Sequence, residues 1–178
     1  RLAVWIAKNS QDRKRPVIVY GHKNPYMVVC FLACAKAGRS YVPQDICIPV
    51  SRVDETVLSV EPELTFVVEG DYQTEIGTEI GKDEIEEIVK QETNETDVLQ
   101  PLTKDEVWYI IFTSGSTGKP KGVEITRDCL SHYLDWSVQL GSTMKEKSGA
   151  HFMNQAPFSF DLSVMDLYTS LVCGGTLY

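Results

Sequence analysis

Short β-branched runs alternate with segments of helical pattern along this chain, and this alternation constrains the fold more than any other feature. VIVY at 17–20 and LTFVV at 64–68 favour strands, because branched side chains pack well on a pleated surface. Residues 25–37 and 53–60 carry the apolar spacing of helices. Strand and helix in alternation predict an α/β fold with a mostly parallel sheet flanked by helices. The other expected elements are strands at 40–43, 107–112 and 123–126, helices at 82–91, 127–140 and about 163–172, and a strand-like stretch at 151–158.

Charge and apolar run length restrict the classes of partner. The 178 residues carry a formal net charge of −8, which argues against nucleic acid as the main partner because phosphate contacts need clustered Lys and Arg. The longest apolar run, roughly 26–35, is too short to span a bilayer, and no signal peptide is visible. We therefore expect a cytoplasmic chain without membrane insertion. Residue 1 is Arg, and GGTLY at the other end reads as the start of a strand, so both ends look truncated.

Cysteine and histidine spacing indicates no metal site. The five cysteines (30, 34, 47, 129 and 173) form no C-x-x-C pair, and Cys30 and Cys34 share one face of the helix expected at 25–37. We expect buried thiols in a reducing compartment. No carboxylate or cysteine stands at a recognisable ligand spacing from His22, His132 or His151, so these are expected to be structural or surface residues.

Residues 69–106 carry about half of the acidic groups and few basic ones. The segment includes the tandem TEIGTEIG and an amphipathic stretch at 82–91. A charge run of this kind is typical of a solvated surface excursion, which we prefer to a specific cation site.

The stretch TSGSTGKPKG at 113–122 follows the apolar run VWYIIF and has almost no apolar side chain to bury. Glycine allows tight turns and close approach to a ligand, and consecutive backbone N–H groups form an anion-binding concavity. Four hydroxyls and two lysines add donors and positive charge, which suits a polyphosphate. The spacing matches neither a Walker A loop nor a dinucleotide fingerprint. The residues expected to contact phosphate are Thr113, Ser114, Gly115, Ser116, Thr117, Gly118, Lys119 and Gly122.

Three motifs in order then resemble the adenylate-forming superfamily. YIIFTSGSTGKPKGVEIT resembles its phosphate-loop signature, while KAGRSYVPQD at 36–45 and FSFDLSVMDLY at 158–168 resemble motifs of its amino-acid-activating branch. The resemblance implies that residues 1–178 are part of the large N-terminal AMP-binding domain, without the small C-terminal domain. It also implies ATP and Mg²⁺ as cofactors, and Lys121 as the catalytic residue that neutralises charge on the leaving pyrophosphate.

The third motif implies the substrate site. By resemblance, Asp161 holds the α-ammonium group of an amino acid; the alternative is that Asp161 only caps the following helix. Phe160 matches an aromatic residue that shapes the carboxylate side of the pocket. Leu162 and Met165 fall where family members line the side-chain pocket, or else they pack in the core.

Within that branch, NQAPFSFDLSVMDLY at 154–168 and YVPQDICIPVSRV at 41–53 resemble most the ligases that activate D-alanine for teichoic acid D-alanylation. This resemblance implies D-alanine as the small amino acid substrate and a phosphopantetheinylated carrier protein as the partner. Two alternatives stay open: a peptide-synthetase adenylation domain for another small amino acid, and a catalytically incomplete binding fragment.

Overall fold

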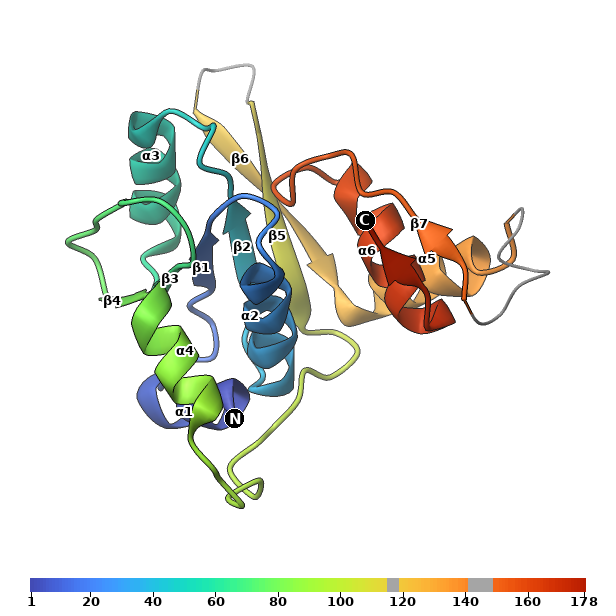
Figure 1. Cartoon of the computed structure of the whole chain (residues 1–178). Helices are drawn as coiled ribbons and strands as arrows, with labels where there is room; N and C mark the ends of the chain where they lie inside the picture. The colour runs from blue at the N-terminus through green and yellow to red at the C-terminus, as the bar shows by residue number, and fades with distance from the viewer. Residues whose placement is uncertain (115–118, 141–148) are drawn as a thin grey trace.

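The protein is described by a computed structural model that covers residues 1–114, 119–140 and 149–178. Its centre is a six-stranded sheet with the order β4-β3-β1-β2-β5-β6 (Figure 1). Five of these strands are parallel, and β6 pairs antiparallel with β5. The predicted α/β fold with a mostly parallel sheet is therefore confirmed. The strands are β1 Val17–Tyr20, β2 Tyr41–Gln44, β3 Leu64–Val67, β4 Thr78–Gly81, β5 Val107–Ser114 and β6 Pro120–Thr126, and a separate parallel pair joins β7 His151–Phe152 to β8 Thr176–Leu177.

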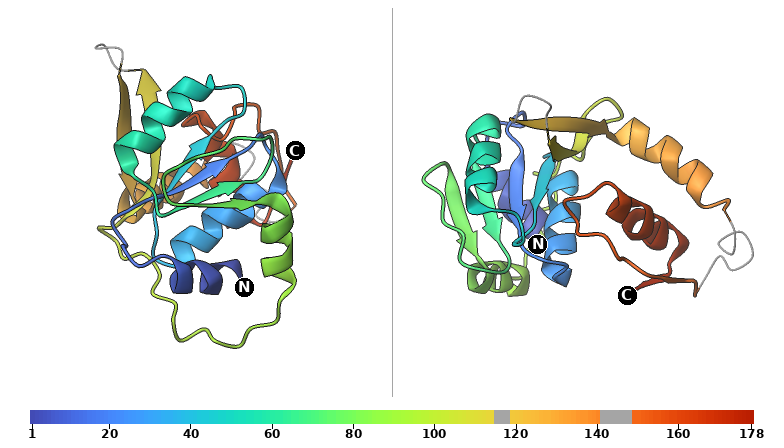
Figure 2. Two further views of the ribbon diagram at one scale, coloured as in Figure 1. Left: turned by 90° about the vertical axis from the view of Figure 1, so that its left-hand side faces the viewer. Right: turned by 90° about the horizontal axis from the view of Figure 1, so that it is seen from above.

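Helices cover both faces of the sheet (Figure 2). One face packs against α1, α2, α4 and α6, whereas α3 buries Val53 and Val57 against the other face. Figure 1 shows α5, α6 and β7 grouped beside the β5–β6 end of the sheet. The helices are α1 Leu2–Asn9, α2 Pro25–Lys36, α3 Val50–Val60, α4 Lys82–Lys90, α5 Arg127–Ser137 and α6 Leu162–Cys173. None of them, within the described ranges, has the length and apolar character that crossing a bilayer requires.

Helix α2 shows how local sequence sets element boundaries. The Asn24 side chain accepts a hydrogen bond from the Tyr26 N–H (3.0 Å), and Pro25 occupies the first helical position. Gly38, just past the C-terminus, has a φ of +72°, a conformation that glycine adopts without strain. Its missing side chain also leaves room for the chain to fold back, because a Cβ there would lie 2.2 Å from the Gln100 carbonyl oxygen. Cys30 and Cys34 on this helix are fully buried, as expected, but Cys47 and Cys129 are exposed, so the expectation of buried thiols is wrong for those two.

The chain changes direction across the sheet at β1 and β2. It passes from β1 through α2 to β2, and then through α3 on the opposite face to β3, which lies on the other side of β1. The loops leaving the carboxyl ends of β1 and β2 therefore diverge to opposite faces. In open α/β sheets, the crevice at such a switch point is the usual place for a ligand.

The structure of the acidic segment 69–106 differs in part from the sequence prediction. Residues 78–81 form the edge strand β4, paired with β3, and 82–90 form α4, which packs on the sheet. Ile80, Ile85 and Ile88 are buried, so the interpretation as a solvated excursion is wrong for 78–90. The apolar side chains at helical spacing decide the outcome, because they can be buried while the acidic side chains of the same helix face water.

Other boundaries also differ from expectation. The strand expected at 123–126 begins at Pro120, the helix expected to reach 140 ends at Ser137, and the stretch at 151–158 is a strand only at 151–152. Strand β7 pairs with β8 only at His151 and Phe152, and Pro157 lies beyond it in the segment before α6.

Candidate active site

The glycine-rich stretch connects the two strands of an antiparallel hairpin. In β5, Tyr109, Ile110 and Ile111 are buried, as expected for a strand covered on both faces, whereas Thr113 and Ser114 at its end are exposed. Thr113 is paired with Lys121 and Ser114 with Pro120. Sequence reasoning found both strands but not their pairing. The predicted phosphate contacts Gly115, Ser116, Thr117 and Gly118 lie outside the described residues.

Lys119, Lys121 and Gly122, at and near the start of β6, have different surroundings. Lys119 and Lys121 are exposed, and the Lys121 carbonyl accepts a long hydrogen bond of 3.5 Å from the Thr113 hydroxyl. Gly122 faces two apolar side chains: a Cβ at this position would lie 3.0 Å from Ile110 and 3.1 Å from Phe112. A side chain at 122 would therefore require Ile110 and Phe112 to shift by a few tenths of an ångström. The contact of Gly122 with phosphate stays a prediction.

A cavity of about 540 Å³ brings the hairpin and the FSFD motif together. Thr113 and Ser114 line it from the hairpin, and Phe160 and Asp161 line it from the segment before α6. Residues that lie 47 positions apart (Ser114 and Asp161) thus share one cavity. Its remaining walls come from the end of β2, the following turn, α3 and β6.

Asp161 stands at the N-terminus of α6 and is exposed. Its Oδ1 accepts a hydrogen bond of 2.9 Å from the Leu162 N–H, so the predicted capping role is present. In the described part of the chain, no Lys, Arg or His forms an ion pair with this carboxylate. Burial, and then the charge of Asp161, raise the pKa of the Tyr109 hydroxyl to about 12. The Asp161 carboxylate is therefore held by the Leu162 N–H and has no ion-pair partner among the described residues.

A second cavity of about 300 Å³ lies on the other side of Asp161 and is lined by Leu162 and Met165. The exposed fraction is 60% for Leu162 and 42% for Met165, so neither packs in the core formed by the described residues, and their contact with a substrate stays a prediction. Phe160, 59% exposed, lines only the larger cavity. The other three predicted substrate residues therefore lie on two sides of Asp161.

Two contacts that the sequence did not reveal fix the segment carrying these residues. The Lys23 ammonium donates to the carbonyl oxygens of Asn154 and Gln155, each at 2.7 Å. Lys23 lies in the loop after β1, more than a hundred residues away, and no local pattern links it to this segment.

In the larger cavity, Ser159 is 8% exposed, and its hydroxyl group has no hydrogen-bond partner among the described residues.

A model of the AMP-binding enzyme family matches residues 1–178, which is the whole chain. The chain belongs to the AMP-binding enzyme family. Among curated family members, it is 42% identical to a D-alanine–D-alanyl carrier protein ligase of Bacillus thuringiensis (strain Al Hakam) and 43% identical to the ligase of that name from Bacillus mycoides (strain KBAB4). Each match covers 99% of this chain and 35% of the relative, so the chain spans about a third of the relatives' length.

Solved structures of this family share the fold. The N-terminal subdomain of NpsA from Klebsiella oxytoca, in complex with 3-hydroxybenzoyl-AMSN, matches with a TM-score of 0.79 at 21% identity, over 99% of this chain and 43% of that one. The nonribosomal peptide synthetase FmoA3 in its AMPPNP-bound form matches with a TM-score of 0.78 at 21% identity, over 99% and 18%. VinN in complex with 3-methylaspartate gives a TM-score of 0.80 at 16% identity, over 98% and 50%. At these identities the likeness supports the fold alone.

Proposed function

We propose that this chain contributes the phosphate-binding and amine-binding parts of an AMP-forming ligase. The ligase activates D-alanine with ATP and passes it to the phosphopantetheine thiol of a carrier protein, for teichoic acid D-alanylation. The observation that carries the proposal is the cavity of about 540 Å³ that Thr113, Ser114, Phe160 and Asp161 line together. D-alanine follows from the ligases that are 42–43% identical over 99% of this chain. Because ATP is a substrate, the reaction takes place in the cytoplasm.

The first step joins the two substrates. An oxygen of the amino acid carboxylate attacks the α-phosphorus of ATP, the bond to the bridging oxygen breaks, and pyrophosphate leaves with an aminoacyl-adenylate remaining. Catalysis of this step consists mainly of positioning and of neutralising charge on the leaving group. Thr113, Ser114 and Lys119 lie at the hairpin end, where donors and positive charge can meet phosphate. Lys121 neutralises the charge that develops on pyrophosphate.

Asp161 holds the other substrate by its amine. An ammonium group that leaves water needs a paired anion, and a charge-assisted hydrogen bond is stronger than a neutral one. The bond to the Leu162 N–H orients the carboxylate and still leaves lone pairs for a ligand. Leu162 and Met165 narrow the neighbouring cavity around a small side chain, while Phe160 lies on the side of the substrate carboxylate.

The second step uses the carrier protein. The thiolate of phosphopantetheine attacks the carbonyl carbon of the adenylate, the bond to the phosphate oxygen breaks, and AMP leaves as the thioester forms. Residues 1–178 make up about a third of the length of the curated relatives, so this step is assigned to the complete ligase and no residue here is given a role in it.

A magnesium ion accompanies ATP in the implied reaction. Mg²⁺ prefers oxygen ligands. The one cluster of three potential metal ligands found in the described part of the chain contains imidazole and thiol groups, and none of its residues lines the cavity described above. These residues do not fit a magnesium site, and we derive no step through the ion.

ATP–pyrophosphate exchange over a panel of amino acids, measured with the complete protein encoded by the gene, tests the proposal. We expect exchange with D-alanine and little with L-alanine, glycine or D-serine. Preference for another small amino acid would instead support a peptide-synthetase adenylation domain. Binding of ATP without exchange for any amino acid would support a non-catalytic role.

A variant of Lys121 tests the proposed phosphate-binding role separately. Removing a charge stabiliser of this kind costs about 3 kcal/mol, or roughly 10²-fold or more in rate, so Lys121→Ala is expected to slow exchange by that factor. Lys104→Ala removes an exposed lysine that does not lie on the hairpin and serves as the control. Equal exchange rates in the two variants would contradict the role of Lys121.

A further inference from the structure

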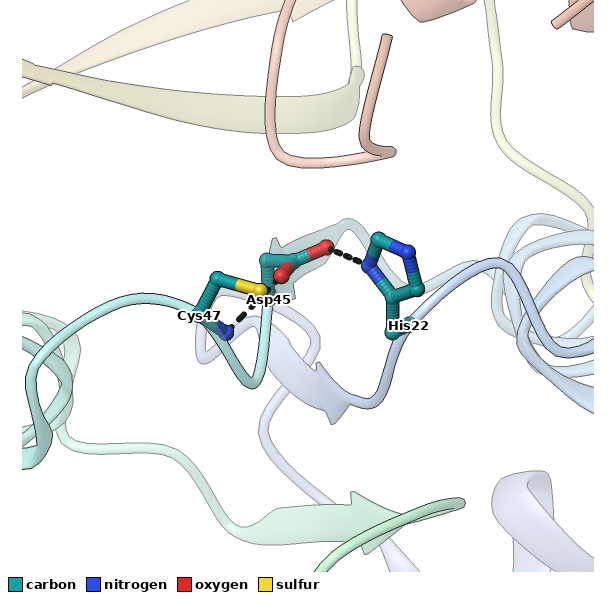
Figure 3. Close-up of side chains that lie close together, drawn as sticks. All are labelled: His22, Asp45 and Cys47. Atoms are coloured by element: carbon teal, nitrogen blue, oxygen red, sulfur yellow. Dashed lines mark hydrogen bonds and ion pairs between the residues drawn. The ribbon is translucent and has the colours of Figure 1, made fainter. Parts of the chain in front are cut away.

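His22, Asp45 and Cys47 meet at the carboxyl ends of two neighbouring parallel strands. His22 follows β1, while Asp45 and Cys47 follow β2. Figure 3 shows the imidazole and the thiol group on either side of the Asp45 carboxylate. Their potential ligand atoms (Nδ1 or Nε2, a carboxylate oxygen and Sγ) all lie within 4.8 Å of one another. His22 is exposed, as expected of a surface residue, but the sheet brings it next to Asp45, a contact that the spacing in the sequence did not indicate.

This cluster occupies the switch point of the sheet. The loop after β1 leads to α2 on one face, and the loop after β2 leads to α3 on the other. The crevice between two such diverging loops is where open α/β sheets most often bind ligands. In this structure the active-site cavity lies toward the β5–β6 hairpin, so the cluster is a separate feature of the same sheet edge.

The Asp45 carboxylate is held in one orientation. Asp45 is 3% exposed, and its Oδ1 accepts a hydrogen bond of 2.9 Å from the Cys47 N–H. Its Oδ2 lies 2.8 Å from His22 Nδ1. One oxygen is therefore fixed by the backbone, as outer-shell hydrogen bonds fix the carboxylate ligands of metal sites. The other oxygen faces the imidazole.

The two outer residues leave an entry path. The His22 side chain is 42% exposed, and Cys47 is exposed as well. Both side chains can rotate without disturbing the core, and an ion can reach the buried carboxylate between them. A ligand–metal distance of about 2.0 to 2.3 Å for nitrogen, oxygen and sulfur places ligand atoms about 3 to 4 Å apart. Small side-chain rotations reach that geometry from the observed one.

We propose that His22, Asp45 and Cys47 form a three-ligand site for a divalent cation of the zinc class, with water in the fourth position. The donor set of one imidazole, one carboxylate and one thiolate matches zinc and cobalt, whereas magnesium and calcium take oxygen ligands. The cation takes the place of the hydrogen bond between His22 Nδ1 and Asp45 Oδ2. Because a cysteine binds such a cation as the thiolate, binding releases a proton.

Binding would also fix part of the active-site wall. The turn that holds Asp45 and Cys47 continues into Ile48 and Pro49, which line the cavity of about 540 Å³. A cation that joins this turn to the loop after β1 therefore stabilises one wall of that cavity. The site itself does not depend on the proposed ligase activity.

Titration of the metal-free full chain with Co²⁺ tests the site directly. Cobalt bound to a thiolate gives a charge-transfer absorption band in the near ultraviolet, and we expect one equivalent of Co²⁺ to produce it. Cys47→Ser removes the sulfur ligand at an exposed position and is expected to abolish the band. His22→Gln is expected to keep the band and to weaken apparent affinity by roughly tenfold or more.

The matched control is Cys129→Ser, which removes another exposed cysteine and is expected to leave the band unchanged. Zn²⁺ is also expected to raise the melting temperature of the unmodified protein and of Cys129→Ser, but not of Cys47→Ser, because a ligand that binds only the folded state stabilises it. A band that persists in Cys47→Ser, or no band in the unmodified protein, would overturn the proposal. A band lost in Cys129→Ser instead would do the same.

Discussion

The hydroxyl oxygens of Tyr41 and Tyr168 lie 2.5 Å apart and share a hydrogen bond in the core. Tyr41 belongs to the motif KAGRSYVPQD on β2, and Tyr168 closes the motif FSFDLSVMDLY on α6. The Trp108 indole N–H also donates to the Tyr168 hydroxyl, at 2.8 Å. Both tyrosines are buried, so these polar groups have no access to water as a substitute partner. This network fixes α6, with Asp161 at its N-terminus, against the sheet.

Tyr168→Phe is expected to destabilise the protein by about 1–3 kcal/mol, because it leaves the Tyr41 hydroxyl and the Trp108 N–H without their common partner. Tyr41→Phe is the matched control, since it keeps the bond between Trp108 and Tyr168 and should cost less. Urea unfolding of the two variants measures the difference. Equal losses would contradict a central role for the Tyr168 hydroxyl.

Gly38→Ala is expected to lower the free energy of unfolding by about 1–3 kcal/mol. Two causes act together: a φ of +72° and a clash of the new Cβ with the Gln100 carbonyl oxygen at 2.2 Å. Gly174→Ala separates them, because Gly174 has a φ of +63° and a Cβ added there would meet nothing within 4 Å. Denaturant unfolding should give a smaller loss for Gly174→Ala. Equal losses of unfolding free energy in the two variants would show that the clash with the Gln100 carbonyl oxygen is not the main cause.

Glu106 is expected to make stability fall in acid. The backbone N–H of Thr103, and then the Arg13 guanidinium, lower the pKa of Glu106 to about 2 from an ordinary value of 4.5. A carboxyl group whose pKa is depressed by folding stabilises the folded state above its ordinary pKa, and this contribution is lost as the pH falls from about 4.5 to about 2. Because the side chain is 35% exposed, solvent screening limits the effect to about 1 kcal/mol or less.

The comparison of Glu106→Gln with the unmodified protein at pH 7 and pH 3 measures this contribution. The cost of the substitution should be smaller at pH 3, where the native carboxylate has begun to lose its advantage. Glu87→Gln, at an exposed position on α4, controls for the change in net charge. A cost that is independent of pH would show that the charge of Glu106 is not the cause.

Lys23→Met is expected to loosen the segment that leads to Asp161 while it keeps the aliphatic stem of the side chain. The lost hydrogen bonds to the Asn154 and Gln155 carbonyls should raise the KM for the amino acid more than they lower kcat. Lys14→Met, at a position in the loop between α1 and β1, is the control. If the KM for the amino acid in pyrophosphate exchange is unchanged in Lys23→Met, Lys23 does not position the segment that carries Asp161.

Sequence reasoning succeeded where the pattern was local. The β-branched runs and helical spacing predicted most strands and helices, and Asn24-Pro25 marked the start of α2. The apolar positions of 82–91 predicted a helix there as well. These features depend on neighbours in the chain, which a pattern of a few residues can report.

The errors concern relationships across the fold. The prediction that 78–81 is a solvated excursion is wrong because this segment forms strand β4 by pairing with β3. The residue pattern of β6 predicts a strand but not its antiparallel direction relative to β5. The contact of His22 with Asp45 depends on the register of β1 with β2. Residues that are distant in the sequence become neighbours through strand pairing, and a local sequence pattern does not predict which residues these are.

The most direct test of the account is the effect of Asp161→Asn on ATP–pyrophosphate exchange by the complete protein. Asn keeps the size of the side chain and an acceptor for the Leu162 N–H, but it removes the charge that pairs with the substrate ammonium. We predict that the KM for D-alanine rises by roughly 10²-fold, as for other lost charge-assisted contacts, with the KM for ATP nearly unchanged. Asp135→Asn, at an exposed position on α5, should behave as the unmodified protein does. A D-alanine KM that is unchanged in Asp161→Asn would contradict the account.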